Sequence, residues 1–284
     1  MNSFLFRQIA KYFKWHYSLG FKLYSYCVGK TSRNIFCFLF NLSALIRGKK
    51  IRFTYDTEAK SYQATDATYK LSFHHVKQAN MAYADGIESR GQNLGQAYFL
   101  DQIEFRPDDV VIDCGANVGD LYLYFRVNNL KVKYTGFEPS PLEYKSLRAN
   151  VQPQACYNLG LWHENGNLKF YVSSQGADSS LIEPSSYDQI IDVETKRLDT
   201  LLSGSIRLLK IEAEGAEPEV LLGSENLFKN VDYISADLGF ERGKEQSSTL
   251  ETVINLLLEK NFELVTVSHS RIVALFRNKN MTAV

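Results

Sequence analysis

The segment of residues 110–119, which reads VVIDCGANVG, constrains the fold of this chain more than any other. It opens with apolar, β-branched residues typical of a buried strand and then presents Asp113, Gly115 and Gly119. Because glycine has no side chain, the backbone at these positions can turn sharply and approach a ligand closely. The segment therefore predicts a buried strand that leads into a ligand-binding loop.

A second apolar segment, residues 134–137, ends in Glu138. This acid follows Gly119 at the separation of about twenty residues that is typical of a ribose-binding acid. A dinucleotide site would instead bind a pyrophosphate at the start of the next helix, where Asp113 would repel it. A cationic ligand with a ribose fits the two acids better. S-adenosylmethionine carries a sulfonium, an ammonium and a ribose, and we expect it as the cofactor.

From residue 109 onward, strand patterns alternate with helix patterns. We expect strands at 110–113, 134–137, 155–161, 168–173, 206–211 and 231–237, helices at 118–127, 141–151, 218–222 and 249–260, and a closing hairpin of 262–267 and 272–276. This order predicts an α/β fold, doubly wound around a mostly parallel sheet, with a terminal antiparallel hairpin. Ligands of such sheets bind at the carboxyl ends of the strands.

Two segments precede this domain of residues 107–284. Residues 1–50 read as a basic, aromatic-rich helical extension, and residues 51–106 as a small lead-in. Within the lead-in, weak alternation over 51–73 predicts a short antiparallel pair of strands, and a helix is expected from Leu94 to Glu104.

Charge is unevenly distributed along the chain. The first 55 residues hold ten Lys and Arg and no acid, while the formal net charge of the whole chain is zero. An aromatic stripe accompanies the basic residues, formed by Phe6, Ile9, Ala10, Phe13 and Tyr17. One interpretation is an interfacial helix on anionic lipid, which would place a cytoplasmic protein at the inner face of the membrane. The other is an ordinary amphipathic helix packed on the domain. The apolar run 35–46 is too short to span a bilayer.

The segment 210–219 is unusually acidic for the end of a buried strand. Alternation along a strand would place Glu212 and Glu214 on one side. Like charges placed close together raise a carboxyl pKa, and such a group can act as a general base toward a hydroxyl. We therefore expect Glu212 and Glu214 to be catalytic. The alternative is solvated charge before a helix start.

Two further polar segments are candidates for substrate contact. Asp178 and Ser179 belong to a loop after the inserted strand, and Asp237 and Arg242 lie at the end of the strand 231–237 and just after it. Four scattered cysteines form neither a disulfide framework nor a zinc motif. No metal ligands are assigned. A carboxylate cluster of Glu212, Glu214 and Asp237 could hold magnesium, but no spacing rule supports such a site, and metal dependence stays open.

These segments together resemble the FkbM family of S-adenosylmethionine-dependent methyltransferases over roughly residues 85–278. The resemblance rests on DVVIDCGANVG, GFEPSP, RLDTL and above all LKIEAEGAE at 209–217. It implies a class I methyltransferase fold with a seven-stranded sheet, and O-methylation of sugars, polysaccharides or polyketides. It also implies the cofactor residues Asp113, Gly115, Asn117, Gly119, Glu138 and Asn158, to which we add their neighbours Ala116, Pro139, Ser140 and Leu159. The family usually has Asp at the position of Glu212, so the geometry there is open.

The leading hypothesis is an O-methyltransferase that acts on a glycan, a related small molecule or a lipid-linked sugar. A nucleic-acid methyltransferase that uses the basic N-terminal segment is a second hypothesis, although the acidic remainder of the chain disfavours nucleic acid. A non-catalytic module that binds S-adenosylmethionine is a third. The acceptor, the oligomeric state and the role of residues 1–80 stay open.

Overall fold

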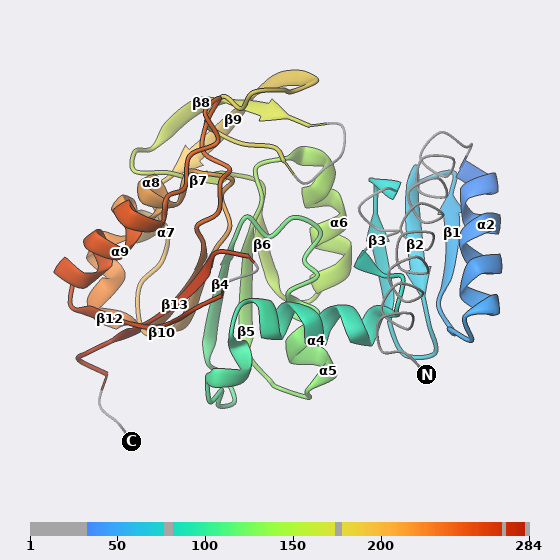
Figure 1. Ribbon diagram of the computed structural model, residues 1–284, viewed down its shortest axis with the longest axis horizontal. Coiled ribbons are helices and arrows are strands. Elements are labelled where there is room, and N and C mark those ends of the chain that lie inside the picture. Colours follow the sequence, from blue (N-terminus) through green and yellow to red (C-terminus); the bar gives the residue numbers. More distant parts are fainter. Residues whose placement is uncertain (1–32, 77–81, 174–177, 269–270, 282–284) are drawn as a thin grey trace, which may run out of the picture.

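The structure is a computed structural model that describes residues 33–76, 82–173, 178–268 and 271–281. Its largest element is a seven-stranded sheet with the strand order β12-β13-β11-β10-β4-β5-β6 (Figure 1). The strands are β4 (Val110–Cys114), β5 (Lys133–Phe137), β6 (Ala155–Tyr157), β10 (Ile206–Ile211), β11 (Val231–Asp237), β12 (Phe262–Val267) and β13 (Val273–Asn278). β13 runs antiparallel to both neighbours, and the remaining pairs are parallel. The predicted doubly wound, mostly parallel sheet with a terminal hairpin is confirmed.

Helices cover both faces of this sheet, which explains why its central strands are almost wholly apolar. On one face, Val111 and Leu208 pack among residues of α4 (Ile87–Ala97), α5 (Tyr122–Val127) and α6 (Pro141–Val151). On the other face, Ile112 and Leu209 pack among residues of α8 (Glu217–Leu222) and α9 (Leu250–Glu259), next to α7 (Leu198–Leu201) and the 3-10 helix Glu225–Asn230. Successive residues of one strand thus serve opposite cores.

A second sheet is inserted after β6, where it interrupts the alternation of strands and helices. It comprises β7 (Gly160–Leu161), β8 (Gly166–Val172) and β9 (Gln189–Lys196) in the order β7-β9-β8. The single strand expected over 155–161 is therefore wrong, because the chain leaves the main sheet after Tyr157 and enters the inserted one at Gly160. The strand expected at 168–173 is present as β8, whereas β9 was not anticipated.

The N-terminal part forms a small α/β unit beside α6 (Figure 1). Helix α2 (Arg33–Ile46) packs on a three-stranded antiparallel sheet of β1 (Arg52–Asp56), β2 (Ser61–Thr65) and β3 (Lys70–Phe73). The expected pair of strands is thus a three-stranded sheet. The expected boundary at residue 50 also differs from the structure, because the rings of Phe36 and Phe40 from α2 share one core with Phe53 of β1.

Two predicted helices have different bounds in the structure. Instead of a helix from Leu94 to Glu104, α4 ends at Ala97, because Phe99 adopts a left-handed conformation before the 3-10 turn Leu100–Gln102. α5 begins at Tyr122 rather than at 118, because the glycine loop extends further. The aromatic stripe from Phe6 to Tyr17 lies outside the described residues. Among the helices described, none has the length and apolarity needed to cross a bilayer.

Candidate active site

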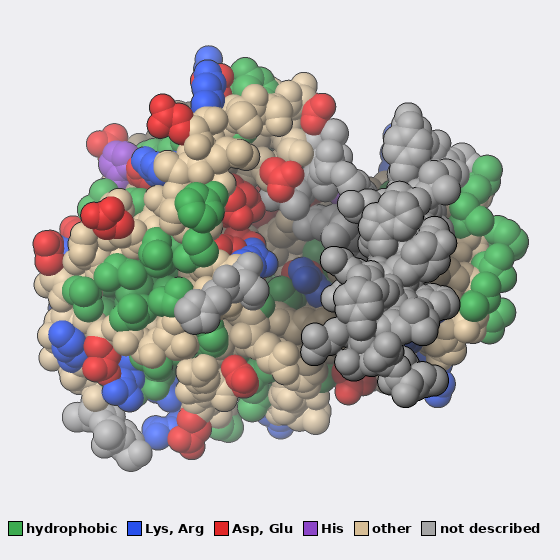
Figure 2. Space-filling model, viewed as in Figure 1, with side chains coloured by type: hydrophobic (Ala, Val, Ile, Leu, Met, Phe, Trp, Pro, Cys, Tyr) green, Lys and Arg blue, Asp and Glu red, His purple; other side chains and the backbone are tan. Residues whose placement is uncertain are grey.

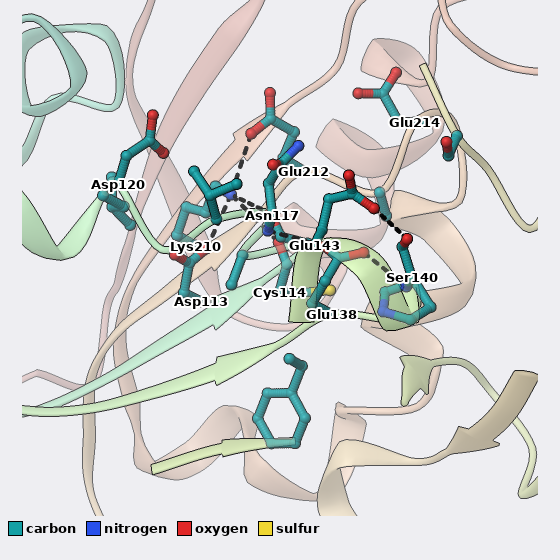
Figure 3. A pocket seen from close by; sticks show the side chains of 18 of the residues that line it. Asp113, Cys114, Asn117, Asp120, Glu138, Ser140, Glu143, Lys210, Glu212 and Glu214 are labelled. Atoms are coloured by element: carbon teal, nitrogen blue, oxygen red, sulfur yellow. Dashed lines mark hydrogen bonds and ion pairs between the residues drawn. The ribbon is translucent and has the colours of Figure 1, made fainter. Parts of the chain in front are cut away.

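A cavity of about 690 Å³ opens at the carboxyl ends of β4, β5 and β10. Its walls come from the two loops that follow β4 and β10, the start of α6, the inserted sheet, the N-terminal unit and α4. Figure 3 shows acidic side chains from several of these elements pointing toward one space. The cavity lies where ligands of doubly wound sheets bind.

The glycine loop after β4 is held between two neighbouring strands. The amides of Gly115 and Ala116 both donate to the carbonyl oxygen of Phe137 at 3.0 Å. Gly115 has a φ of +69°, and a Cβ at this position would lie 1.8 Å from the carbonyl oxygen of Glu212. Glycine is required at 115 because both the backbone conformation and the close approach exclude a side chain.

Glu138 follows β5 and closes the same loop from the other side. Its Oε2 accepts a hydrogen bond from the amide of Asn117 at 2.8 Å, and its Oε1 accepts one from the amide of Ser140 at 2.8 Å. Burial raises the pKa of Glu138 to about 8, against the opposing effect of these amides. The carboxyl group therefore faces the cavity in a fixed position.

An alternating chain of five charges lies at the base of the cavity, and four of its members line the cavity. Lys210 lies 2.9 Å from Asp113 and 3.2 Å from Glu212, measured from Nζ to the nearest carboxylate oxygen. Arg271 then joins Glu212 to Asp237. These residues come from β4, β10, β11 and the turn before β13, so the chain of charges ties four adjacent strands together. Three carboxylates against two cations leave one net negative charge.

The two neighbouring cations determine the protonation state of Glu212. Burial opposes its charge, but Lys210 and Arg271 outweigh burial and lower the pKa of Glu212 to about 2. Burial likewise opposes the charge of Lys210, and Asp113 and Glu212 outweigh it, so the pKa of Lys210 is raised. Glu212 is therefore an ion-pair partner at neutral pH and a poor proton acceptor.

Glu214 has a different environment from Glu212. The sequence predicted Glu212 and Glu214 on one side of a strand. This prediction is wrong, because β10 ends at Ile211 and Glu214 adopts a left-handed backbone conformation with a φ of 50°. Burial and then the charge of Glu241 raise the pKa of Glu214 to about 10. In the described part of the chain, no ion pair to a cation involves Glu214. Its carboxyl group is thus the acid of this loop that can exchange a proton.

Glu217 holds the loop that carries Glu214. Its Oε1 accepts hydrogen bonds from the amides of Ala213 and Gly215 at 3.0 Å, and its Oε2 accepts one from Thr249 Oγ1 at 2.9 Å. Ser180 Oγ donates to the carbonyl oxygen of Glu214 at 2.8 Å and connects the loop to the inserted sheet. Glu217 is therefore a positioning residue for Glu214.

The cavity brings together most of the residues singled out in the sequence. It is lined by Asp113, Gly115, Ala116, Asn117, Glu138, Pro139, Ser140, Asp178, Ser179, Glu212 and Glu214. Gly119 lies behind it, where a Cβ would meet the side chains of Leu147 and Val151.

Besides Gly119, four expected site residues do not line the cavity. Asn158 instead donates to the carbonyl oxygens of Glu138 and Pro139, and Leu159 is buried in the core. Asp237 is buried against Arg271. Arg242 pairs with Glu219 through both its terminal nitrogens and reaches the carbonyl oxygen of Gly215 from outside. These four side chains are engaged by the protein itself, and Asn158 and Arg242 brace the loops around the cavity.

Several lining residues were not anticipated as site residues. Lys210 and Arg271 complete the chain of charges, and Tyr98 lies beneath both cations, at 5.2 Å and 5.5 Å from its ring centre. Arg90 and His75 reach the cavity from the N-terminal half. A lysine inside the buried run LLKI at the end of β10 was the available sequence signal, because a buried cation requires buried acids. Among the described residues, no group of three or more His, Cys, Asp and Glu could hold a metal ion.

The sequence of residues 113–264 matches the family profile described as the methyltransferase FkbM domain. The chain belongs to the FkbM methyltransferase family. Members of this family use S-adenosylmethionine, so the chain is an S-adenosylmethionine-dependent methyltransferase.

Three relatives show how this FkbM-family chain compares with other members. It is 25% identical over 213 residues to the 2-O-methyltransferase NoeI of Sinorhizobium fredii, covering 67% of this chain and 87% of the relative. It is 40% identical over 169 residues to the 31-O-demethyl-FK506 methyltransferase FkbM of Streptomyces tacrolimicus, covering 46% and 65%. It is 27% identical over 143 residues to the hexuronic acid methyltransferase AglP of Haloferax volcanii, covering 48% and 58%.

The residues of the cavity fit the chemistry of this cofactor. A carboxyl group at Glu138 can accept hydrogen bonds from ribose hydroxyls, and the net negative charge of the chain of charges at the base of the cavity favours a sulfonium. The volume of the cavity lies within the range of about 300–1,000 Å³ that is usual for small-molecule sites.

Proposed function

We propose that this protein is an O-methyltransferase that transfers a methyl group to a hydroxyl of a sugar, a glycan or a lipid-linked sugar. The observation that carries the proposal is Glu214, a carboxyl group without a cationic partner among the described residues, which lines the same cavity as the glycine loop and Glu138. Transfer to a hydroxyl requires removal of its proton as the oxygen attacks, and a positioned carboxylate can accept that proton.

In this proposal the cofactor is held by the residues around the glycine loop. Gly115, Ala116 and Asn117 present backbone atoms, Glu138 accepts the ribose hydroxyls, and Pro139 and Ser140 border the nucleoside. Asp113 contributes negative charge beneath the cofactor site rather than a direct contact, because its carboxylate is buried and is bound by Lys210 and Tyr134. The bound cofactor supplies an electrophilic methyl group on a cationic sulfur.

The protein's own part in the reaction is to orient the acceptor and to take up its proton. Glu214 receives the hydroxyl proton while the acceptor oxygen gains the methyl group. Glu212 stays ionised and fixes Lys210 and Arg271. Asp178 and Ser179 lie on the wall formed by the inserted sheet and are placed to contact the acceptor.

A sugar hydroxyl is the favoured acceptor for two reasons. The relatives named above include enzymes for a 2-O position and for a hexuronic acid. The cavity near Glu214 is acidic, with Asp178 and Glu241 as neighbours, and would repel the phosphates of a nucleic acid.

Incubation with S-adenosylmethionine carrying a labelled methyl group, together with neutral oligosaccharides and lipid-linked sugars, tests this proposal. Mass spectrometry should find a product heavier by one methylene whose methyl group survives mild base, as an ether does. Label recovered only in base-labile esters or on nitrogen would contradict O-methylation of a hydroxyl.

Replacement of Glu138 by Ala should weaken the binding of S-adenosylhomocysteine by about tenfold or more, because two ribose hydroxyls would each lose a hydrogen bond worth about 0.5–1.5 kcal/mol. Isothermal titration calorimetry gives the affinity directly. Glu143→Ala is a matched control, since Glu143 lines the cavity but is engaged by His75 and Ser140. An unchanged affinity in Glu138→Ala would rule out the ribose assignment.

We further propose that the protein contacts an anionic membrane from the cytoplasmic side through the N-terminal unit. Figure 2 shows apolar side chains along the edge formed by α2. They are Ile35, Phe38, Leu42, Leu45 and Ile46, and Phe38 and Ile46 are 65% and 78% exposed. Exposed basic residues flank this strip at both ends, Arg33 before it and Lys50 and Arg52 after it. An apolar face bordered by cations fits the surface of an anionic bilayer.

The triple variant Phe38→Ser, Leu45→Ser, Ile46→Ser should lose most of its sedimentation with phosphatidylglycerol vesicles. Point changes are preferable to deletion of residues 1–50, because α2 shares a core with β1–β3. Leu258→Ser is the control, since Leu258 is an exposed leucine on α9, away from the N-terminal unit, at 44%. Equal sedimentation of the triple variant and this control would argue against the membrane role.

A further inference from the structure

Arg90 is a cation of the cavity that the methyl-transfer chemistry described above does not use. It lies on α4, and its Nε and Nη2 both donate to Oδ2 of Asp120 at 2.7 Å. Asp120 directly follows Gly119, so the guanidinium is fixed to the end of the glycine loop. A guanidinium has five N–H donors, and donors therefore remain for a ligand.

The other two strong cations of the cavity are already matched by acids. Lys210 lies between Asp113 and Glu212, and Arg271 lies between Glu212 and Asp237. In the described part of the chain, Arg90 forms an ion pair with a single acid, Asp120. Arg90 is thus the cation with the most capacity to bind an added anion.

A carboxylate that enters this cavity needs such a cation. The described lining residues include eight Asp and Glu but only three Lys and Arg. A ligand carboxylate without a cationic partner would be repelled by these acids and would lose its hydration on burial. The amino-acid end of S-adenosylmethionine carries a carboxylate, so its position in the cavity is constrained.

The two ends of the cavity differ in character. Figure 3 shows Asp120 at one end and Ser140 and Glu143 at the other, with Asp113 and Lys210 between them. The lining also includes apolar side chains that suit a purine ring, Phe137 directly before Glu138 and Leu161 and Phe170 of the inserted sheet. A ribose at Glu138 therefore leaves the first end, with Arg90, for the amino-acid part.

We propose that Arg90 binds the α-carboxylate of the cofactor's amino-acid moiety, so that α4 selects ligands with an intact amino acid. The proposal rests on the cofactor assignment above and deepens it. It does not depend on the acceptor, because it concerns binding alone.

The test compares two ligands that differ only in this carboxylate, S-adenosylmethionine and its decarboxylated form, by titration calorimetry. Wild-type protein should bind S-adenosylmethionine about ten- to one-hundredfold more tightly. Arg90→Gln should lose that preference by weakening the binding of S-adenosylmethionine alone. Arg90→Lys keeps the charge and should retain part of the preference. Arg126→Gln, which alters a cation stacked on Tyr69 outside the cavity, should behave as wild type.

Two results would overturn the proposal. Equal affinity of the wild-type protein for both ligands would show that no group recognises the carboxylate, whether or not the variants fold. An equal loss for both ligands in Arg90→Gln and Arg90→Lys would mean that Arg90 only braces the glycine loop through Asp120. Failure of O-methylation with every acceptor would leave the ligand preference unaffected, so the two proposals fail separately.

Discussion

Replacement of Lys210 by Met should destabilise the protein by about 3–5 kcal/mol, the range for removal of one partner of a buried ion pair. Asp113 is fully buried, and Lys210 is its only cationic partner among the described residues. Methionine fills a similar volume, so the loss reflects the uncompensated acid rather than a void. Urea unfolding followed by circular dichroism measures the change in the free energy of unfolding.

Two further variants make this experiment decisive. Lys133→Met removes a cation that pairs with Asp108 at an exposed site and should change stability by less than about 1 kcal/mol. The double variant Lys210→Met, Asp113→Asn removes both charges and should recover much of the stability lost in the single variant. Two results would contradict the role given to the buried chain of charges. One is a Lys210→Met variant as stable as Lys133→Met, and the other is a double variant whose free energy of unfolding is no higher than that of Lys210→Met.

Replacement of Glu214 by Gln should lower kcat by about 10²–10⁴-fold, the contribution usual for a general base. Glutamine keeps the size of the side chain but cannot accept the hydroxyl proton. Since only the deprotonated carboxylate acts as a base, the wild-type rate should rise with pH until Glu214 has ionised. Its pKa is about 10 in the ligand-free cavity. The positive charge of the bound cofactor lowers that pKa, so the rise should end below pH 10 when cofactor is saturating. In Glu214→Gln this pH dependence should disappear.

Glu241→Gln provides the matched comparison for the pH profile. The charge of Glu241 is the largest electrostatic contribution that raises the pKa of Glu214. Its removal should shift the profile of the rate to lower pH while the rate at high pH is retained. A profile that keeps its position in Glu241→Gln, or that persists in Glu214→Gln, would exclude Glu214 as the base.

The sequence was informative wherever function required an unusual residue type at a strand end. Asp113, Gly115 and Glu138 could be singled out because an acid or a glycine directly after a buried apolar run has few structural explanations, and all three line the cavity. The mostly parallel, doubly wound sheet followed from alternating strands and helices. The inserted sheet was recognised only through β8, because β7 has two residues and does not display a period.

The partners of the acids could not be predicted from spacing. Arg271 reaches Glu212 and Asp237 across two strands, and Arg90 comes from a helix that precedes the sheet. The contrast between Glu212 and Glu214 depends on these contacts, because the same residue type has its pKa lowered to about 2 in one case and raised to about 10 in the other. Asp237 and Arg242 were expected to contact substrate because they lie at the end of β11 and just after it, but other charged side chains engage them.

A crystal structure of the protein with S-adenosylhomocysteine is the most direct test of the central claim, that this cavity is the methyl-transfer site. The ribose hydroxyls should lie within hydrogen-bond distance of Glu138, the ligand carboxylate should contact Arg90, and the sulfur should face the space in front of Glu214. A ligand bound outside this cavity, or one whose sulfur is directed away from Glu214, would contradict the account.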